Sequence, residues 1–264
     1  MLFSAPWLGW PPATKVGRLR ILLINPNTTA SVTALLATHV RAVAGDAAGF
    51  VPVTGRFGAR YISSRASAAI AGHAALDALA IHGRDCDAVF LACFGDPGLL
   101  ALRELAEMPV VGMAEASCLA ACEGGRRFAI VTGGALWQPM LTEFVAALGL
   151  ADRLAAVRAI APTGGEIAKN PDAALALLAA ACTACATDDG ADVVILGGAA
   201  LAGLATRIQP NVPVPVLCSV EAGTRAAIAA AKNASVRRAD PPPALDSTGL
   251  GAELAALLRQ TRRP

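Results

Sequence analysis

Short apolar runs alternate with longer, Ala-rich segments along most of the chain, and this alternation constrains the fold more than any other feature. Each apolar run has the length of a strand buried on both faces, and strands that alternate with helices form parallel sheets with right-handed crossovers. We therefore expect an α/β fold. The expected strands are residues 20–24, 50–53, 87–92, 110–111, 127–131, 155–160, 192–196 and 214–217, and the expected helices are 31–44, 67–81, 99–106, 115–122, 138–148, 171–186, 221–231 and 251–260.

The second half of the chain repeats the pattern of the first. The segment Asp87-Ala-Val-Phe-Leu-Ala-Cys93 resembles Asp192-Val-Val-Ile-Leu-Gly-Gly198, which indicates an internal duplication. We expect two similar parallel-sheet α/β domains related by a pseudo-two-fold axis, with the active site in the cleft between them. The predicted first domain is 19–115 plus 219–264, the predicted second domain is 116–218, and residues 1–18 are expected to be a flexible N-terminal extension.

Composition excludes several classes of function. With 55% hydrophobic and 16% charged residues the chain can build a large core, and a net charge of +2 leaves no footprint for nucleic acid or an anionic membrane. No apolar stretch is long enough to span a bilayer. Seven cysteines lie mostly in apolar segments and no export signal precedes them, so we expect reduced thiols in the cytoplasm. Whether the protein is a homo-oligomer is left open.

Small and polar residues follow five of the expected strands, at 25–29, 93–98, 132–134, 197–201 and 218–219. Ligands of open parallel sheets bind beyond the carboxyl ends of the strands, and small residues leave backbone N–H groups free to hold a carboxylate or an enolate oxygen. Any one of these segments could simply form a turn, but five together predict a pocket for a small carboxylate or hydantoin-like molecule. The candidate substrate-binding residues at these ends are Asn25, Thr28, Phe94, Gly95, Asp96, Thr132, Gly133, Gly197 and Ala199.

Cys93 is the candidate catalytic residue. It directly follows an apolar strand and precedes the Gly95-Asp-Pro-Gly98 turn, so its sulfur should face the pocket. A thiol with a pKa of about 8.5, lowered further by helix N-terminal amides, could take a proton from an acidic carbon near neutral pH. The alternative is a buried structural cysteine. Asp96 could orient Cys93, or it could only stabilise the turn and cap the next helix.

The chain has no recognisable cofactor site. None of its three lysines lies at a strand end, and neither a GxGxxG turn nor a phosphate-binding GxxxxGK[ST] loop is present. The three histidines fall on or just after expected helices, and the CxxC pair Cys182/Cys185 lies within an Ala-rich helix without a second pair. We expect an enzyme that uses neither metal nor organic cofactor.

Five motifs in the same order resemble those of hydantoin and allantoin racemases, members of the aspartate/glutamate/hydantoin racemase superfamily. The resemblance spans about residues 20–231, and Cys93-Phe-Gly-Asp-Pro-Gly98 is its most specific string. It implies a two-domain α/β enzyme without metal or pyridoxal phosphate, in which two cysteines flank the stereocentre of the substrate. The motifs are Ile24–Thr29, Ala92–Leu99, Pro109–Ala116, Arg127–Thr132 and Val194–Gly203.

The resemblance also implies roles for individual residues. The first catalytic cysteine corresponds to Cys93, Asn25 would help to hold the substrate, and Thr132 and Gly133 would lie on the opposing side. Tyr61 lies in a segment that resembles the substrate-covering segment of the racemases, although core packing or a surface loop is an equal interpretation.

The chain departs from the family pattern at the second cysteine. Hydantoin racemases have Leu-Gly-Cys-Ala-Gly where this chain has Leu196-Gly-Gly-Ala-Ala200, so the second thiol is replaced by Gly198. Three interpretations stay open. Another group, such as Cys218 or Ser219, supplies the second proton; or Cys93 alone protonates an enolate from one face, as in arylmalonate decarboxylase; or the protein binds small acids without catalysis.

Overall fold

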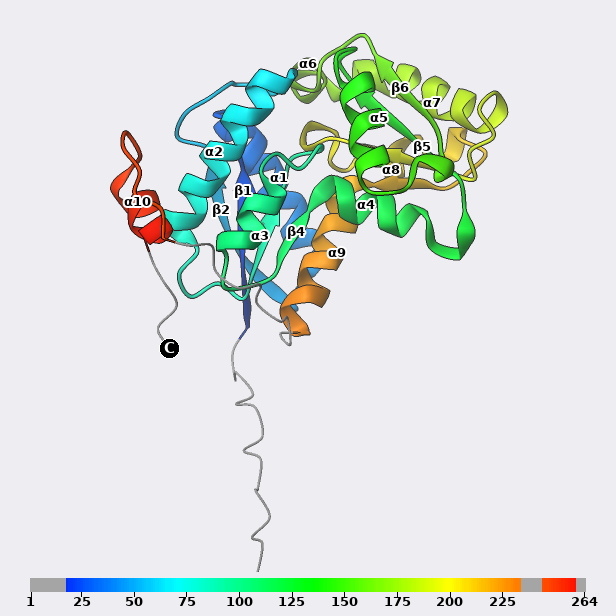
Figure 1. Cartoon of the computed structure of the whole chain (residues 1–264). Coiled ribbons are helices and arrows are strands. Elements are labelled where there is room, and N and C mark those ends of the chain that lie inside the picture. The colour runs from blue at the N-terminus through cyan, green and yellow to red at the C-terminus, as the bar shows by residue number, and fades with distance from the viewer. Residues whose placement is uncertain (1–17, 234–243, 260–264) are drawn as a thin grey trace, which may run out of the picture.

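Two four-stranded parallel sheets form the framework of the protein (Figure 1). The structure is a computed structural model that describes residues 18–233 and 244–259. Both sheets have the same strand order, with the first and third strands of each half at the centre, so the expected α/β fold with two similar halves is confirmed. The first sheet has the order β2-β1-β3-β4 and comprises β1 (Leu19–Asn25), β2 (Ala48–Thr54), β3 (Ala88–Leu91) and β4 (Val110–Gly112). The second has the order β6-β5-β7-β8 and comprises β5 (Phe128–Gly133), β6 (Leu154–Ile160), β7 (Val193–Leu196) and β8 (Val216–Cys218).

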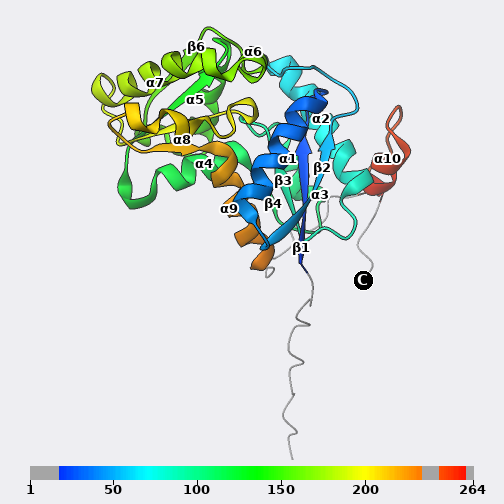
Figure 2. The same ribbon diagram turned by 180° about the vertical axis from the view of Figure 1, so that it is seen from behind.

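The central strands are apolar because both of their faces are covered. Every residue of β3 and β7 is buried, as are the last five residues of β1. Helices α1 and α9 cover one face of the first sheet (Figure 2), and α2 and α3 lie on the other side (Figure 1). The helices are α1 (Ala30–Ala44), α2 (Arg65–His82), α3 (Leu99–Leu105), α4 (Met113–Ala121), α5 (Trp137–Ala147), α6 (Gly164–Lys169), α7 (Pro171–Thr187), α8 (Leu204–Ile208), α9 (Ser219–Lys232) and α10 (Ala252–Arg259).

Helix α6 is not among the helices expected from the sequence. Its sequence signal is a capping box: the Thr163 hydroxyl accepts from the Glu166 N–H, and the Glu166 carboxylate accepts from the Thr163 N–H at 2.7 Å. The two glycines behind Thr163 hid this signal, because glycine is a poor helix former.

The two halves are packed on each other through exchanged helices. Helix α4 follows the last strand of the first sheet and contacts β7 and β8 of the second, whereas α9 follows the last strand of the second sheet and contacts β1, β3 and β4. One continuous apolar core therefore includes residues of both sheets, such as Phe90 and Phe128. The chain division predicted at residues 115/116 and 218/219 stays a prediction, and the predicted extension lies outside the described residues except for Arg18.

Among residues 18–233 and 244–259, no helix has the length and apolar character needed to cross a membrane. The same residues contain no group of three His, Cys, Asp or Glu side chains arranged to hold a metal ion.

Candidate active site

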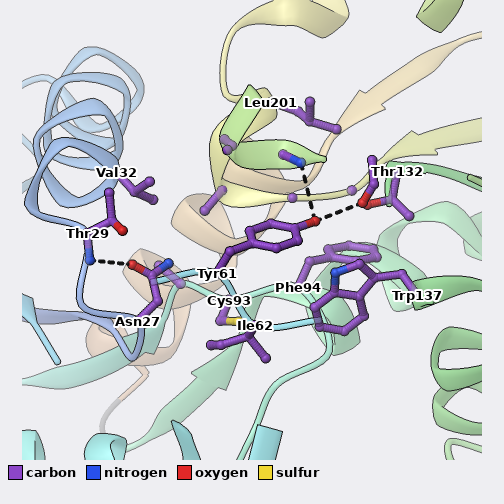
Figure 3. A pocket seen from close by; sticks show the side chains of 18 of the residues that line it. Asn27, Thr29, Val32, Tyr61, Ile62, Cys93, Phe94, Thr132, Trp137 and Leu201 are labelled. Carbon is purple, nitrogen blue, oxygen red and sulfur yellow. Dashed lines mark hydrogen bonds between the residues drawn. The ribbon is translucent and has the colours of Figure 1, made fainter. Parts of the chain in front are cut away.

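A cavity of about 90 Å³ lies where the central strands of the two sheets end. Its walls come from the segments that follow β1, β2 and β3 in the first half, and from the end of β5 and the segments that follow β5, β6 and β7 in the second (Figure 3). Of the residues predicted to form the site, eight line this pocket: Tyr61, Cys93, Phe94, Thr132, Gly133, Gly197, Gly198 and Ala199. The other lining residues are Asn27, Thr29, Val32, Arg60, Ile62, Ala92, Trp137, Gly164, Gly165, Ala200 and Leu201.

Asn25 supports the pocket from behind and does not line it. Its side chain is fully buried, and its Nδ2 donates to Asn27 Oδ1 at 3.1 Å and to Thr33 Oγ1 at 3.0 Å. These bonds hold Asn27 in place, and of the two residues it is Asn27 that lines the cavity. Thr28 also lies outside the lining, with its N–H donating to Ala59 O at 3.1 Å.

Cys93 lies at the end of β3 with its sulfur directed into the pocket (Figure 3) and 8% of its surface exposed. Burial raises the pKa of this thiol well above its ordinary value, and the negative charge of Asp96 raises it further. The expectation of a lowered pKa is therefore wrong. Within the part of the chain that the structure describes, no positive charge offsets the removal of the sulfur from water, so the thiol is neutral at pH 7.

Asp96 serves the turn and the next helix, and it does not line the pocket. It adopts a left-handed backbone conformation with φ 47°, and its carboxylate accepts from the N–H groups of Ala114 at 2.9 Å and Glu115 at 2.8 Å in the first turn of α4. Burial nevertheless raises the pKa of Asp96 to about 7. Gly95 does not line the pocket either. A side chain at Gly95 would meet the Trp137 ring, and its φ of 116° favours glycine.

Replacing Asp96 should change the titration of Cys93. In Asp96→Asn the charge that opposes thiolate formation is removed, so the pKa of Cys93 should fall and alkylation by iodoacetamide should become fast at a lower pH. Loss of one N–H acceptor at the start of α4 should cost about 1–3 kcal/mol of stability. The measurement is the pH dependence of alkylation at Cys93, followed by mass spectrometry, with Glu115→Gln as the control for a neighbouring carboxylate. An unchanged profile would contradict the electrostatic role of Asp96.

The turn after β7 faces Cys93 from the second half. Gly197 can carry no side chain, because a Cβ atom would lie 2.5 Å from the Phe94 ring. Gly198 has φ 141° and ψ 138°, and its N–H donates to Ser219 Oγ at 3.2 Å. A Cβ atom on Gly198 would have space, with Leu201 at 3.6 Å and Thr132 Oγ1 at 3.9 Å. What opposes a side chain there is the backbone conformation, which L-residues rarely adopt.

The sequence indicated that the backbone N–H groups of this turn are free to bind a ligand, but the structure shows that two of them already have acceptors. The Gly197 N–H donates to Val131 O at 2.9 Å, and the Gly198 N–H is taken by Ser219. The N–H groups of Ala199 and Ala200 begin a short 3₁₀ turn over Ala199–Leu201 and have no acceptor within it. These two amides are therefore the ones available to a substrate oxygen.

Cys218 and Ser219 do not reach the pocket. Cys218 is buried at the end of β8 and borders a separate surface cavity with Gln209 and Glu221. Ser219 is fully buried and holds the turn through its bond to Gly198. Neither side chain lies opposite Cys93.

Tyr61 connects the two halves across the pocket (Figure 3). Its hydroxyl donates to Gly133 O at 2.8 Å and accepts from the Gly164 N–H at 3.3 Å. Burial raises the pKa of the Tyr61 phenol, so it stays protonated. Its side chain is thus part of the pocket wall and a tie between the 55–64 segment and the second half.

Removing the Tyr61 hydroxyl should loosen this tie. Tyr61→Phe keeps the ring but leaves Gly133 O and the Gly164 N–H without their partner, which should lower the free energy of unfolding by about 1–3 kcal/mol. Amide exchange at Gly164 should accelerate. The matched control is Thr132→Val, since the Thr132 hydroxyl has no hydrogen-bond partner within the described part of the chain. Equal stability losses in the two variants would contradict the tie.

Thr132 and Trp137 form the side of the pocket that belongs to the second half. Thr132 is 5% exposed and its hydroxyl is free to bind a ligand. Trp137 was missed because an aromatic residue at the start of a helix is typical of core packing. The sequence also did not indicate three other lining residues, Val32, Arg60 and Ile62. Nothing in the local sequence shows which side of a loop or helix faces a distant strand end.

Fold and site together define a class: an α/β protein of two like halves that encloses a small pocket with a thiol on one wall and a glycine-rich turn on the other. Comparison with known proteins agrees with this class. The sequence pattern of the Asp/Glu/hydantoin racemase family matches residues 21–227. A hydantoin racemase of Paenarthrobacter aurescens is 33% identical over 213 residues, which cover 79% of this chain and 89% of that protein.

Solved structures extend the likeness. The allantoin racemase of Pseudomonas fluorescens superposes with a TM-score of 0.80 at 29% identity, covering 93% of this chain and 98% of that one. Arylmalonate decarboxylase shares the fold, with a TM-score of 0.56 at 20% identity over 80% of this chain and 92% of that one. The chain belongs to the Asp/Glu/hydantoin racemase family, and its relatives identify it as an enzyme of the isomerase class.

Proposed function

We propose that the protein moves a proton at an acidic carbon next to a carbonyl or carboxylate, in a hydantoin, allantoin or amino-acid-like substrate, and that Cys93 carries the proton. The observation that supports this most directly is the position of the Cys93 sulfur in a pocket between the two halves. The proposal requires no metal or organic cofactor. We also propose a cytoplasmic location, since none of the seven cysteines, all of which lie within the described residues, forms a disulfide.

In this reaction the Cys93 thiolate takes the proton of the C–H bond, and the electron pair of that bond moves onto the neighbouring carbonyl to form an enolate. In this proposal the N–H groups of Ala199 and Ala200 stabilise the enolate oxygen, which is supported by the position of both residues in the pocket lining. Ionisation of Cys93 is the costly step, since the thiol is buried and neutral before substrate binds. Activity should therefore rise with pH through the neutral and alkaline range.

Return of a proton to the opposite face needs a second donor, because Gly198 has no side chain. Three hydroxyl groups line the pocket, and two of them already donate to backbone carbonyls: Thr29 to Arg60 O at 2.8 Å, and Tyr61 to Gly133 O. Thr132 has the remaining hydroxyl and lies near the position of the missing thiol. We propose that Thr132, directly or through a water molecule, returns the second proton.

The raised pKa of Cys93 favours a second candidate, decarboxylation of a malonate-like acid. There the C–C bond to a carboxylate breaks, CO₂ leaves with the electron pair remaining on the enolate, and a thiol that is already protonated donates its proton to carbon. Water then restores the proton on sulfur. A neutral buried thiol suits this acid role better than the base role, and one donor on one face is sufficient.

Incubation in D₂O separates these reactions. A racemase should exchange the α-proton of a single hydantoin enantiomer for deuterium and invert it, whereas a one-face enzyme should exchange with retention; a decarboxylase should release CO₂ from an arylmalonate. The readouts are proton NMR, chiral chromatography and CO₂ detection. Binding of these acids without exchange or CO₂ release would indicate a non-catalytic binding protein and would contradict the proposal.

A further inference from the structure

Hydrogen-bond donors gather at the end of the pocket that is formed by the segments following β1 and β2. Arg60 is the one charged residue among those that line the cavity, and no Asp or Glu side chain faces it. Within residues 18–233 and 244–259 the Arg60 guanidinium has neither a hydrogen-bond nor an ion-pair partner. An exposed arginine is often only solvated, so a binding role for Arg60 has to be argued from the groups that surround it.

The backbone of Arg60 is fixed at this place. Thr29 Oγ1 donates to Arg60 O at 2.8 Å, and the preceding Ala59 O accepts from the Thr28 N–H at 3.1 Å. The 59–60 segment is thus attached to the loop that follows β1, while the Arg60 side chain stays uncommitted. A fixed backbone with a free guanidinium suits recognition of a ligand.

Two further donors face the same end. Asn27 is 8% exposed, and its Oδ1 accepts from Asn25 Nδ2 and from the Thr29 N–H at 2.9 Å, which fixes the amide orientation (Figure 3). The Asn27 Nδ2 group therefore faces the cavity, and within the described residues it has no acceptor. Helix α1 begins beside it with Thr29 as N-cap, but the Thr29 side chain makes no capping bond and the first turn has no acidic residue. Although the Val32 N–H donates to Thr29 O at 3.0 Å, no acidic side chain of the first turn offsets the positive end of the helix dipole.

We propose that Arg60, the Asn27 amide and the first turn of α1 form a carboxylate-binding subsite, so that the preferred substrate carries an anionic carboxylate in addition to its reacting carbon. Four features point the same way: a cation and an amide donor that have no partner within the described residues, a helix start without a side-chain cap, and the absence of acidic side chains from the lining. This inference rests on the proposed function for the identity of the reacting carbon, but the subsite itself can be tested by binding alone.

The test uses two probes that differ in one formal charge, hydantoin-5-acetate and hydantoin-5-acetamide. Calorimetric titration of a Cys93→Ala variant gives their affinities without turnover, and deuterium exchange by the unmodified enzyme gives kcat/KM. The acetate should bind roughly 10- to 100-fold more tightly than the acetamide, and Arg60→Gln should remove this preference. Arg60→Lys should restore part of it, because the charge returns without the planar fork.

Arg41→Gln is the matched control: it removes the same charge from an exposed position at the other end of α1 and should leave the preference intact. Equal affinity for the two probes, no binding of either, or a preference that survives in Arg60→Gln would overturn the subsite. Absence of exchange with a preserved, Arg60-dependent preference in binding would overturn the proposed reaction and leave the subsite standing, so the two failures are distinguishable.

Discussion

Cys93→Ala should lose about 10³- to 10⁴-fold in the rate of α-proton exchange, since the variant lacks the only thiol that lines the pocket. The loss should appear mainly in kcat, because the sulfur moves the proton and contributes little to holding the substrate. Deuterium incorporation into a hydantoin, followed by proton NMR, measures it. The thermal unfolding of the variant should stay close to that of the unmodified protein, because the mutation removes one sulfur beside an existing cavity.

Cys218→Ala is the control for this experiment. Cys218 is also a buried cysteine at a strand end, but it lies outside the pocket. Its replacement should change exchange less than about threefold. If Cys218→Ala lost activity as strongly as Cys93→Ala, the assignment of the acid/base group would be wrong, and the strand-end geometry would have to be reinterpreted.

Gly198→Cys should raise racemisation by about 10²-fold or more, because it places a second acid/base group on the face opposite Cys93. The site has the necessary space, with no atom closer than 3.6 Å to the added Cβ. The backbone opposes it: at φ 141° an L-residue is strained, so the variant should lose about 1–3 kcal/mol of stability or shift the turn. Chiral chromatography of a single hydantoin enantiomer gives the racemisation rate.

Gly198→Ala separates the thiol from the strain. It carries the same Cβ atom and should show the same loss of stability in chemical denaturation, but no gain in racemisation. A folded Gly198→Cys protein that racemises no faster than Gly198→Ala would show that this position does not face the stereocentre. The family mapping would then be wrong at this residue, although the fold would be unaffected.

The two halves differ at the residue that follows their third strand, Cys93 in the first half and Gly198 in the second. In the first half, Cys93 follows β3 with a side chain in the pocket, whereas the corresponding Gly198 of the second half has a backbone conformation suited to glycine. Its N–H is held by the buried Ser219 hydroxyl. The glycine therefore suits the turn, and a cysteine placed there has to adopt a strained backbone conformation.

The sequence by itself determined the architecture and the place of the pocket. The local periodicity of apolar residues indicates buried strands and amphipathic helices, so the two parallel sheets could be predicted. The ends of the predicted strands then pointed to Cys93, Thr132 and the Gly197–Ala199 turn. Helix α6 was missed, and β8 spans Val216–Cys218 where residues 214–217 were expected. Local sequence signals define the ends of strands and helices only to within one or two residues.

Tertiary structure alone decided which side of each loop faces the pocket. It gave Asn25 a supporting role behind Asn27, brought Arg60 and Trp137 to the lining, and directed Asp96 to the start of α4. It also reversed the expected pKa shift of Cys93, because the burial of a thiol depends on atoms from both halves of the chain. The burial of a side chain and the direction in which it points depend on residues that are distant in the sequence. A local pattern of residues therefore does not predict them.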